Sequence, residues 1–192
     1  MATILMHLYV GKYIKDKYKK IRDLPQYYLG CLYPDSVNAF GSVSSEIRYP
    51  AHLRSKDIDE WYENNNIFYR QNTGKINEDF LLGYIIHNIT DAAYDRHFNY
   101  INRDDWKRFN QEQCKEEWWI SEVLPALKMA VPVSVNDISE TNVEEWLRKL
   151  TDSNYWFNSP EDKPKEITKN MMNELSDIVY KIVCGYINDC NQ

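Results

Sequence analysis

The sequence predicts an all-helical, soluble protein built as one domain over residues 1–192. Glycine and proline are scarce, with six and seven copies, whereas sandwiches and barrels use more of both in their turns. Apolar residues make up 43% of the chain and charged residues 27%, which is ordinary for a globular protein with one core. Apolar side chains also recur at helical spacing through most of the chain. These observations favour a multi-helix bundle.

The N-terminal part is expected to contain two helical segments followed by a long loop. Apolar side chains at helical spacing predict a helix over about 4–21, with Thr3 as its N-cap. A short apolar segment follows between Pro25 and Pro34. Residues 36–55 are rich in serine and show the least periodicity in the chain, which predicts a loop. A loop of that length inside a compact domain is often functional.

Capping side chains predict where the next helices begin. Asp57 is placed to cap a helix over about 58–71, and Asn77 a helix over about 78–98. The second of these is apolar nearly all round, which is typical of a central buried helix. The tract 130–137 is β-branched, and we expect it to be an extended connection. The remaining periodic segments predict helices at about 104–129, with a break or bend near Pro125, at 141–151 and at 164–189.

Charge and cysteine pattern exclude several classes of protein. The net charge of −6 means that the chain lacks the overall basic surface that binds duplex nucleic acid. No stretch approaches the roughly 20 apolar residues of a transmembrane helix, and the first residues do not have the pattern of a secretory signal. The four cysteines form no Cys-x-x-Cys pair. We therefore expect a cytoplasmic protein with free thiols.

A histidine and an aspartate lie four residues apart in the most apolar helix. On a helix, His87 and Asp91 would share one face at a distance of about 6 Å, within reach of one divalent ion. A carboxylate inside such a helix is costly unless it is paired or binds a metal. The spacing is common by chance, and a His–Asp pair or an ion pair between Asp91 and Arg96 remains an alternative.

Three other polar residues are candidates for the same site. His7 interrupts an apolar stretch of the first helix, so we expect it to be at least partly buried. Asp35 follows Pro34 at the end of an apolar segment, where an ordinary turn is the alternative. His52 lies in the irregular stretch, and a surface position is its alternative. Residue types alone do not decide between these readings.

Taken in order, these motifs resemble the zinc-dependent phospholipase C family, which shares its fold with a fungal single-strand-specific nuclease. The similar elements are H-L-Y-V from His7, Y-L-G-C-L-Y-P-D ending at Asp35, His52, L-L-G-Y-I-I-H-N-I-T-D ending at Asp91, and His97. The resemblance covers about residues 1–100, and its specificity comes from the order and spacing of the five elements together. It implies a phospholipase C/nuclease-like helical fold with its metal site in that half of the chain.

The resemblance also implies a set of metal ligands. A first site would use Asp35, His52, His87 and Asp91, a second would use His7 with a bridging Asp91, and His97 would belong to a third. The sequence departs from the family pattern in two respects. The chain keeps Met1, where the secreted members ligate zinc through a processed N-terminal residue, and no histidine follows His97. We therefore expect one or two ions instead of three.

The expected function is metal-dependent hydrolysis of phosphoesters, either phospholipase C-like or by a phosphodiesterase. Imidazole and carboxylate ligands favour zinc, and the ion would activate a water as nucleophile. Asp35 would act as a ligand or as general base, and Arg48 and Arg96 are candidates for phosphate contact. A small molecule or a lipid headgroup would be the substrate. The alternative is a non-catalytic metal-binding helical protein with a structural or vestigial site.

Overall fold

The chain is helical in the part that the structure, a computed structural model, describes: residues 2–152 and 163–187. In chain order the elements are α1 (Ile4–Lys17), α2 (Leu24–Gly30), the 3-10 helix η1 (Tyr33–Asn38), α3 (Ser45–Ala51), α4 (Ile58–Asn72), α5 (Glu78–His97), α6 (Arg103–Gln113), the π-helical segment η2 (Trp119–Val123), α7 (Leu124–Met129), α8 (Glu140–Thr151) and α9 (Lys169–Ile187). Within these ranges there is no β-sheet, and the β-type pairing consists of one isolated bridge between Val135 and Ile138. The all-helical fold is therefore confirmed.

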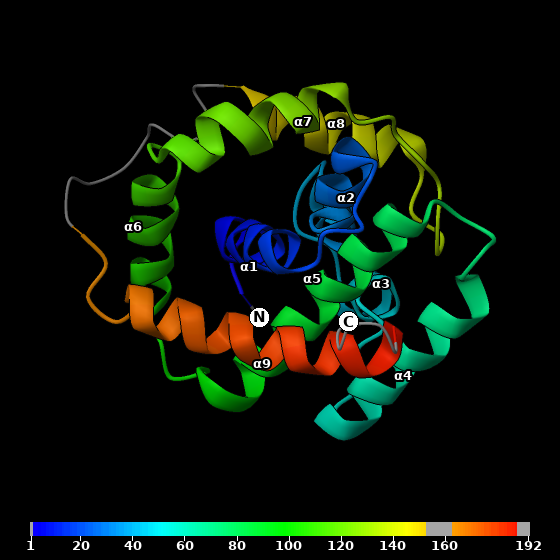
Figure 1. Cartoon of the computed structure of the whole chain (residues 1–192), viewed down its shortest axis with the longest axis horizontal. Helices are drawn as coiled ribbons and strands as arrows, with labels where there is room; N and C mark the ends of the chain where they lie inside the picture. Colours follow the sequence, from blue (N-terminus) through cyan, green and yellow to red (C-terminus); the bar gives the residue numbers. More distant parts are fainter. Residues whose placement is uncertain (1, 153–162, 188–192) are drawn as a thin grey trace.

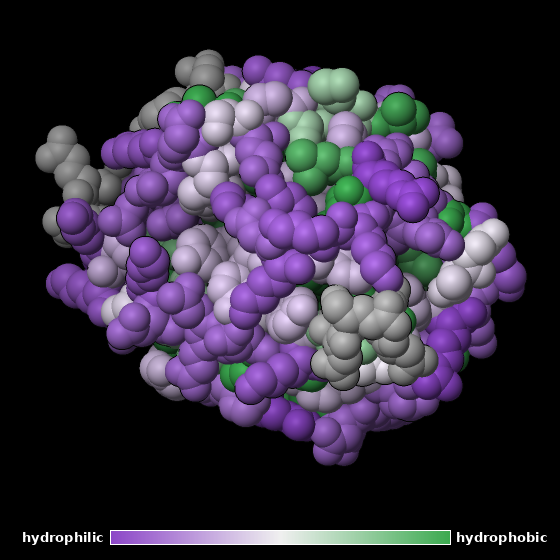
Figure 2. All heavy atoms as spheres, in the orientation of Figure 1, coloured by the Kyte–Doolittle hydropathy of each residue, from purple (hydrophilic) through white to green (hydrophobic). Residues whose placement is uncertain are grey.

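The helices are arranged around a buried centre. Figure 1 shows α1, α2 and α5 in the middle of the molecule, with α4, α6, α7, α8 and α9 around them. The central helix α5 packs against α1, α2, α4 and α9, and its side chains are buried on every face from Phe80 to Tyr94. The face shown in Figure 2 is mostly hydrophilic, with small separate apolar patches. Among the described residues, no helix has both the length and the apolar character to cross a membrane.

Two glycines let α2 and α5 approach more closely than helices with side chains can. A Cβ added to Gly30 would lie 2.2 Å from the carbonyl oxygen of Phe80, and one added to Gly83 would lie 2.1 Å from that of Tyr27. Atoms in ordinary contact are separated by about 3.5 Å or more. The crossing therefore requires glycine on both helices, and it brings the end of α2 against the face of α5 that carries His87.

The predicted caps of the central helices are confirmed. The Asp57 carboxylate accepts hydrogen bonds from two backbone N–H groups of the first turn of α4. The Asn77 side chain accepts from the N–H of Phe80 at 2.9 Å, at the start of α5. Thr3 precedes α1 in an extended conformation, but its hydroxyl donates to the side-chain oxygen of Asn110 and does not cap the helix. It joins α1 to α6 instead.

Several expectations are corrected. The predicted loop over 36–55 contains the second half of η1 and all of α3, so that prediction is wrong. A helix of seven residues is too short to show a clear hydrophobic period, and Pro50 stands in its last turn. The predicted helix over 104–129 is interrupted between α6 and η2 as well as near Pro125. Cys31 and Cys114 are free, as expected, but Cys184 is disulfide-bonded, and Cys190 lies outside the described residues.

Candidate metal centre

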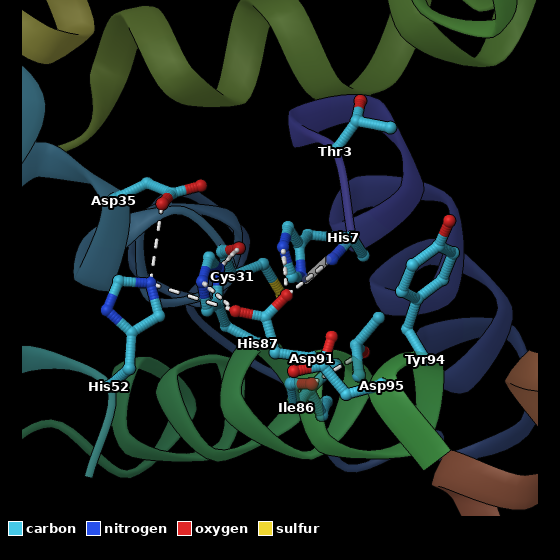
Figure 3. A network of polar contacts seen from close by, with 12 residues as sticks. Thr3, His7, Cys31, Asp35, His52, Ile86, His87, Asp91, Tyr94 and Asp95 are labelled. Atoms are coloured by element: carbon cyan, nitrogen blue, oxygen red, sulfur yellow. Dashed lines mark hydrogen bonds and ion pairs between the residues drawn. The ribbon is translucent and has the colours of Figure 1, made fainter. Parts of the chain in front are cut away.

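Five polar residues from four elements meet in the centre of the fold. His7 comes from α1, Asp35 from η1, His52 from the end of α3, and His87 and Asp91 from α5 (Figure 3). All five are buried, and the four inner ones are fully inaccessible, whereas Asp35 is 9% exposed. The structure therefore brings together these five residues, which the sequence indicated as candidate ligands and which are spread over 85 positions from 7 to 91.

The donor atoms lie at separations that suit a shared ion. The distance from His7 Nε2 to Asp91 Oδ1 is 3.4 Å, and that from His52 Nε2 to Asp35 Oδ1 is 3.3 Å. Asp91 Oδ2 lies 3.8 Å from His52 Nε2 and 3.9 Å from His87 Nε2. Ligands about 2 Å from a tetrahedral ion are themselves about 3.4 Å apart. Two groups could each hold an ion, His7 with His87 and Asp91, and Asp35 with His52 and His87.

Backbone carbonyls fix the orientation of two imidazoles. His87 Nδ1 lies 2.8 Å from the carbonyl oxygen of Cys31, and His52 Nδ1 lies 2.9 Å from that of Arg48. A carbonyl only accepts, so each Nδ1 carries the ring proton, and in the neutral ring Nε2 carries a lone pair. Figure 3 shows the rings turned toward the Asp91 carboxylate. A carbonyl behind a histidine is the usual outer partner of a metal ligand.

The inward-facing atoms lack hydrogen-bond partners within the described protein. These atoms are the Nε2 atoms of His7, His52 and His87 and the Oδ2 atom of Asp91. A buried polar atom without a partner costs about 1–3 kcal/mol, and here the Nε2 lone pairs of His52 and His87 face carboxylate oxygens. A divalent ion satisfies all of them together, because each offers the electron pair that the ion accepts. The residues present therefore fit a metal ion.

Burial and the neighbouring imidazoles set the charge states of His87 and of the two carboxyls. Burial lowers the pKa of His87 to about 3, with the nearby His7 imidazole acting in the same direction. Burial opposes ionisation of Asp35 and Asp91, but the surrounding imidazoles outweigh it and hold the pKa of both carboxyls below the ordinary value. At neutral pH the cluster therefore contains two carboxylates facing a neutral His87.

Side chains from α4, α5 and the connection between α7 and α8 hold the turn that presents His52. The three consecutive carbonyl oxygens of residues 50–52 each accept a hydrogen bond from a distant side chain. Asn136 Nδ2 donates to Pro50 at 2.8 Å, Tyr84 Oη to Ala51 at 2.6 Å, and Trp61 Nε1 to His52 at 2.8 Å. Asn136 also donates to Tyr84 Oη at 2.9 Å, which couples two of these contacts. This support could not be predicted from the sequence, because it joins residues up to 86 positions apart.

Not every predicted residue reaches the cluster. His97 is exposed at the end of α5, and its ten-residue separation from His87 corresponds to about 15 Å along the helix. It belongs to neither group of potential ligands. Arg96 pairs with Asp59 at 2.6 Å on the surface, not with Asp91. The backbone N–H of Ala2 donates to Asp91 Oδ1 at 2.6 Å, a contact that sequence analysis did not anticipate.

A pocket of about 570 Å³ opens beside the cluster, and Asp35 lies on its wall. The Asp35 side chain is 12% exposed, so it faces both the buried imidazoles and the pocket. Arg48 Nη2 lies 3.3 Å from Asp35 Oδ1. Four cationic side chains line this pocket, namely Arg48, Arg54, Arg103 and Lys107. We refer to it as the cationic pocket.

Comparison of the chain with protein-family models, with curated proteins and with solved structures finds no match in any of the three.

Proposed function

We propose that the buried cluster binds one or two divalent ions, most favourably zinc. The supporting observation is the set of inward-facing Nε2 and carboxylate atoms that have no partner among the described residues. Three imidazoles and two carboxylates form a donor set that zinc prefers, and iron, nickel and manganese accept similar sets. His87 would be shared between the two groups of ligands.

We further propose that the protein is a metal-dependent phosphoester hydrolase, phospholipase C-like or a phosphodiesterase. Bound in the cluster, a divalent ion supplies Lewis acidity, which makes water a stronger nucleophile and neutralises charge on phosphate oxygens. The cationic pocket supports this reaction class because it gives an anionic substrate a path to Asp35. The resemblance of the motifs to the zinc-dependent phospholipase C family supports the same class.

The residues of the site would have different roles in this reaction. His52 and His87, oriented by backbone carbonyls, hold the ion. Asp35 either ligates the ion or accepts a proton from the attacking water, since its carboxylate lies between the imidazoles and the pocket. Arg48, which lies 3.3 Å from Asp35, is placed to bind a phosphate oxygen next to the ion. The substrate would be a small-molecule or lipid-headgroup phosphoester.

A non-catalytic metal-binding role is the second candidate. It is favoured by the complete burial of His7, His52, His87 and Asp91, because structural zinc sites are closed by protein ligands. Of the five cluster residues, Asp35 is the one that lines the pocket in the described part of the chain. The choice between enzyme and structural site therefore depends on whether water and substrate reach the ion beside Asp35.

Hydrolysis of bis(p-nitrophenyl) phosphate tests the enzymatic proposal. Metal-free protein, protein reconstituted with zinc, and reconstituted Asp35→Asn protein are compared, with metal content measured in each sample. Turnover only in the reconstituted wild type, reduced by two or more orders of magnitude in Asp35→Asn, is expected. Full metal occupancy without turnover on this or other phosphoesters would contradict hydrolysis and leave the structural role.

A further inference from the structure

We infer that the cationic pocket selects phosphate esters that carry a second negative group and rejects those that carry a cationic headgroup. This inference rests on the proposed function and names its substrate class. The inference is based on the arrangement of charges around Asp35, which belongs to the metal cluster and also lines the pocket. The four cations differ in whether a carboxylate nearby neutralises them. This difference decides how much positive charge the pocket presents to a ligand.

Arg54 forms a fixed and neutralised part of the wall. Its guanidinium donates to Asp95 Oδ2 at 2.8 Å, and Asp95 also lines the pocket. The same guanidinium lies over the rings of Tyr49 and Trp61, at 5.1 and 4.9 Å from their centres. An arginine held by a carboxylate and two aromatic rings has little freedom to move toward a ligand. Arg54 therefore shapes the pocket without adding net charge to it.

Arg48 is neutralised by Asp35 only as long as that carboxylate does not ligate an ion. Its Nη2 atom lies 3.3 Å from Asp35 Oδ1, while its buried Nε atom has no hydrogen-bond partner within the described residues. A divalent ion in the cluster is balanced by the charges of Asp35 and Asp91. Once the Asp35 carboxylate ligates the ion, the positive charge of Arg48 can attract an anion in the pocket.

Arg103 and Lys107 provide further positive charge on the α6 side of the pocket. Both are exposed, and neither has a carboxylate partner among the residues that line the pocket. Lys107 lies 3.7 Å from Asp104, but both side chains are 68% exposed, and such surface pairs contribute little. Arg103 lies over the ring of Trp106, whose Nε1 donates to Tyr94 Oη at 2.8 Å. That ring gives Arg103 a defined position.

With the ion in place, the pocket therefore presents three uncompensated cations to a ligand: Arg48, Arg103 and Lys107. One phosphate group in contact with Asp35 and the ion cannot neutralise all of them. A second anionic group on the ligand gains from this charge, and a trimethylammonium or ammonium headgroup is repelled. At about 6 Å and the effective dielectric of a wet surface, each unit charge changes affinity about three- to tenfold.

The test compares ligands that share one phosphate monoester and differ only in their second group. Calorimetry on the full-length, zinc-loaded protein measures Kd for 3-phosphoglycerate, glycerol 3-phosphate and phosphocholine. Affinity should fall in that order, by about three- to tenfold at each step in low salt, and the differences should shrink in high salt. Equal affinities, or tighter binding of phosphocholine, would overturn the inference.

Charge-removing variants locate the effect. Arg103→Gln and Lys107→Gln should each weaken 3-phosphoglycerate about three- to tenfold and leave phosphocholine unchanged or slightly tighter. Lys128→Gln is the matched control, since Lys128 is exposed on α7 and does not line the pocket. An equal loss in the control would show that overall charge, not the pocket, sets affinity. All three variants change exposed side chains, so their folding should match the wild type.

A vesicle experiment distinguishes a soluble ligand from a lipid phosphate. Cosedimentation with phosphatidylcholine vesicles, with and without phosphatidic acid, is measured for the wild type and Arg103→Gln. Binding that requires both phosphatidic acid and Arg103 assigns the pocket to a lipid, and binding of the soluble series alone assigns it to a soluble ester. Because these readouts need no turnover, a correct affinity order without hydrolysis would refute only the hydrolase proposal.

Discussion

Replacing Gly83 with alanine perturbs the contact on which the geometry of the metal cluster depends. The new Cβ would lie 2.1 Å from the carbonyl oxygen of Tyr27 and 2.8 Å from the backbone nitrogen of Cys31. Both are backbone atoms that cannot rotate away, so α2 and α5 would have to separate by about 1.4 Å to restore ordinary contact. Overpacking of this kind costs about 1–3 kcal/mol or more, which exceeds the 0.5–1 kcal/mol or so gained from helix propensity.

Gly185→Ala is the matched control for this substitution. Gly185 lies in α9, and an added Cβ there meets no atom within 4 Å. The same chemical change should therefore stabilise the protein by about 0.5–1 kcal/mol. Urea unfolding followed by circular dichroism measures both variants. We expect a loss of about 2 kcal/mol for Gly83→Ala and a gain for Gly185→Ala.

The close crossing also has a consequence for metal binding. Cys31, whose carbonyl accepts from His87 Nδ1, lies at the end of α2 and would move with it. Zinc affinity of Gly83→Ala should fall about 10–100-fold, as it does when an outer partner of a ligand is lost. Unfolding free energies that change equally for the two glycine variants would refute this account of the crossing.

Two further substitutions test residues outside the cluster. Asn136→Ala should weaken zinc binding about tenfold and alter the absorption spectrum of the cobalt-loaded protein, because Asn136 holds the turn before His52; an unchanged spectrum would argue against this role. Asp105→Ala should cost about 2–3 kcal/mol at neutral pH, because the buried Asp105 carboxylate accepts three backbone N–H bonds from residues 165–167. Burial raises the pKa of Asp105, but those bonds lower it more. Its stabilising effect should therefore be complete above about pH 4 and disappear as pH falls through the lowered value, where mutant and wild type converge in urea titrations.

The helices that could be predicted from the sequence are those with long periodic faces and capping side chains. Asp57 and Asn77 cap α4 and α5 as their positions indicated, because an N-cap is a local interaction between neighbours. α3 was not predicted, since seven residues make fewer than two turns and reveal no clear period. α3 is held by its packing against η1 and by the hydrogen bond from Trp61 Nε1 to the carbonyl oxygen of His52. Both interactions form only in the folded chain.

In the candidate site, too, the contacts between sequence neighbours could be predicted, and most contacts between distant residues could not. His87 and Asp91 could be placed together from helical spacing, and the buried helix around them made a metal a reasonable explanation. Asp35 and His52 join them through the course of η1 and α3, which only the family resemblance suggested. His97 matched that resemblance in spacing, but it lies on the surface. The role of Asn136 could not be predicted, because the connection after α7 brings it next to Pro50 only in the folded chain.

The metal content of the purified protein shows whether the buried cluster binds an ion. Elemental analysis after growth with added zinc would compare the wild type with His87→Ala/Asp91→Ala, which removes the residues shared by most of the cluster contacts. Lys128→Gln would control for handling, since it changes a surface charge only. We expect one or two ions per chain in the wild type and the control, and none in the double variant. A wild type without stoichiometric metal, or a double variant that retains it, would contradict the account.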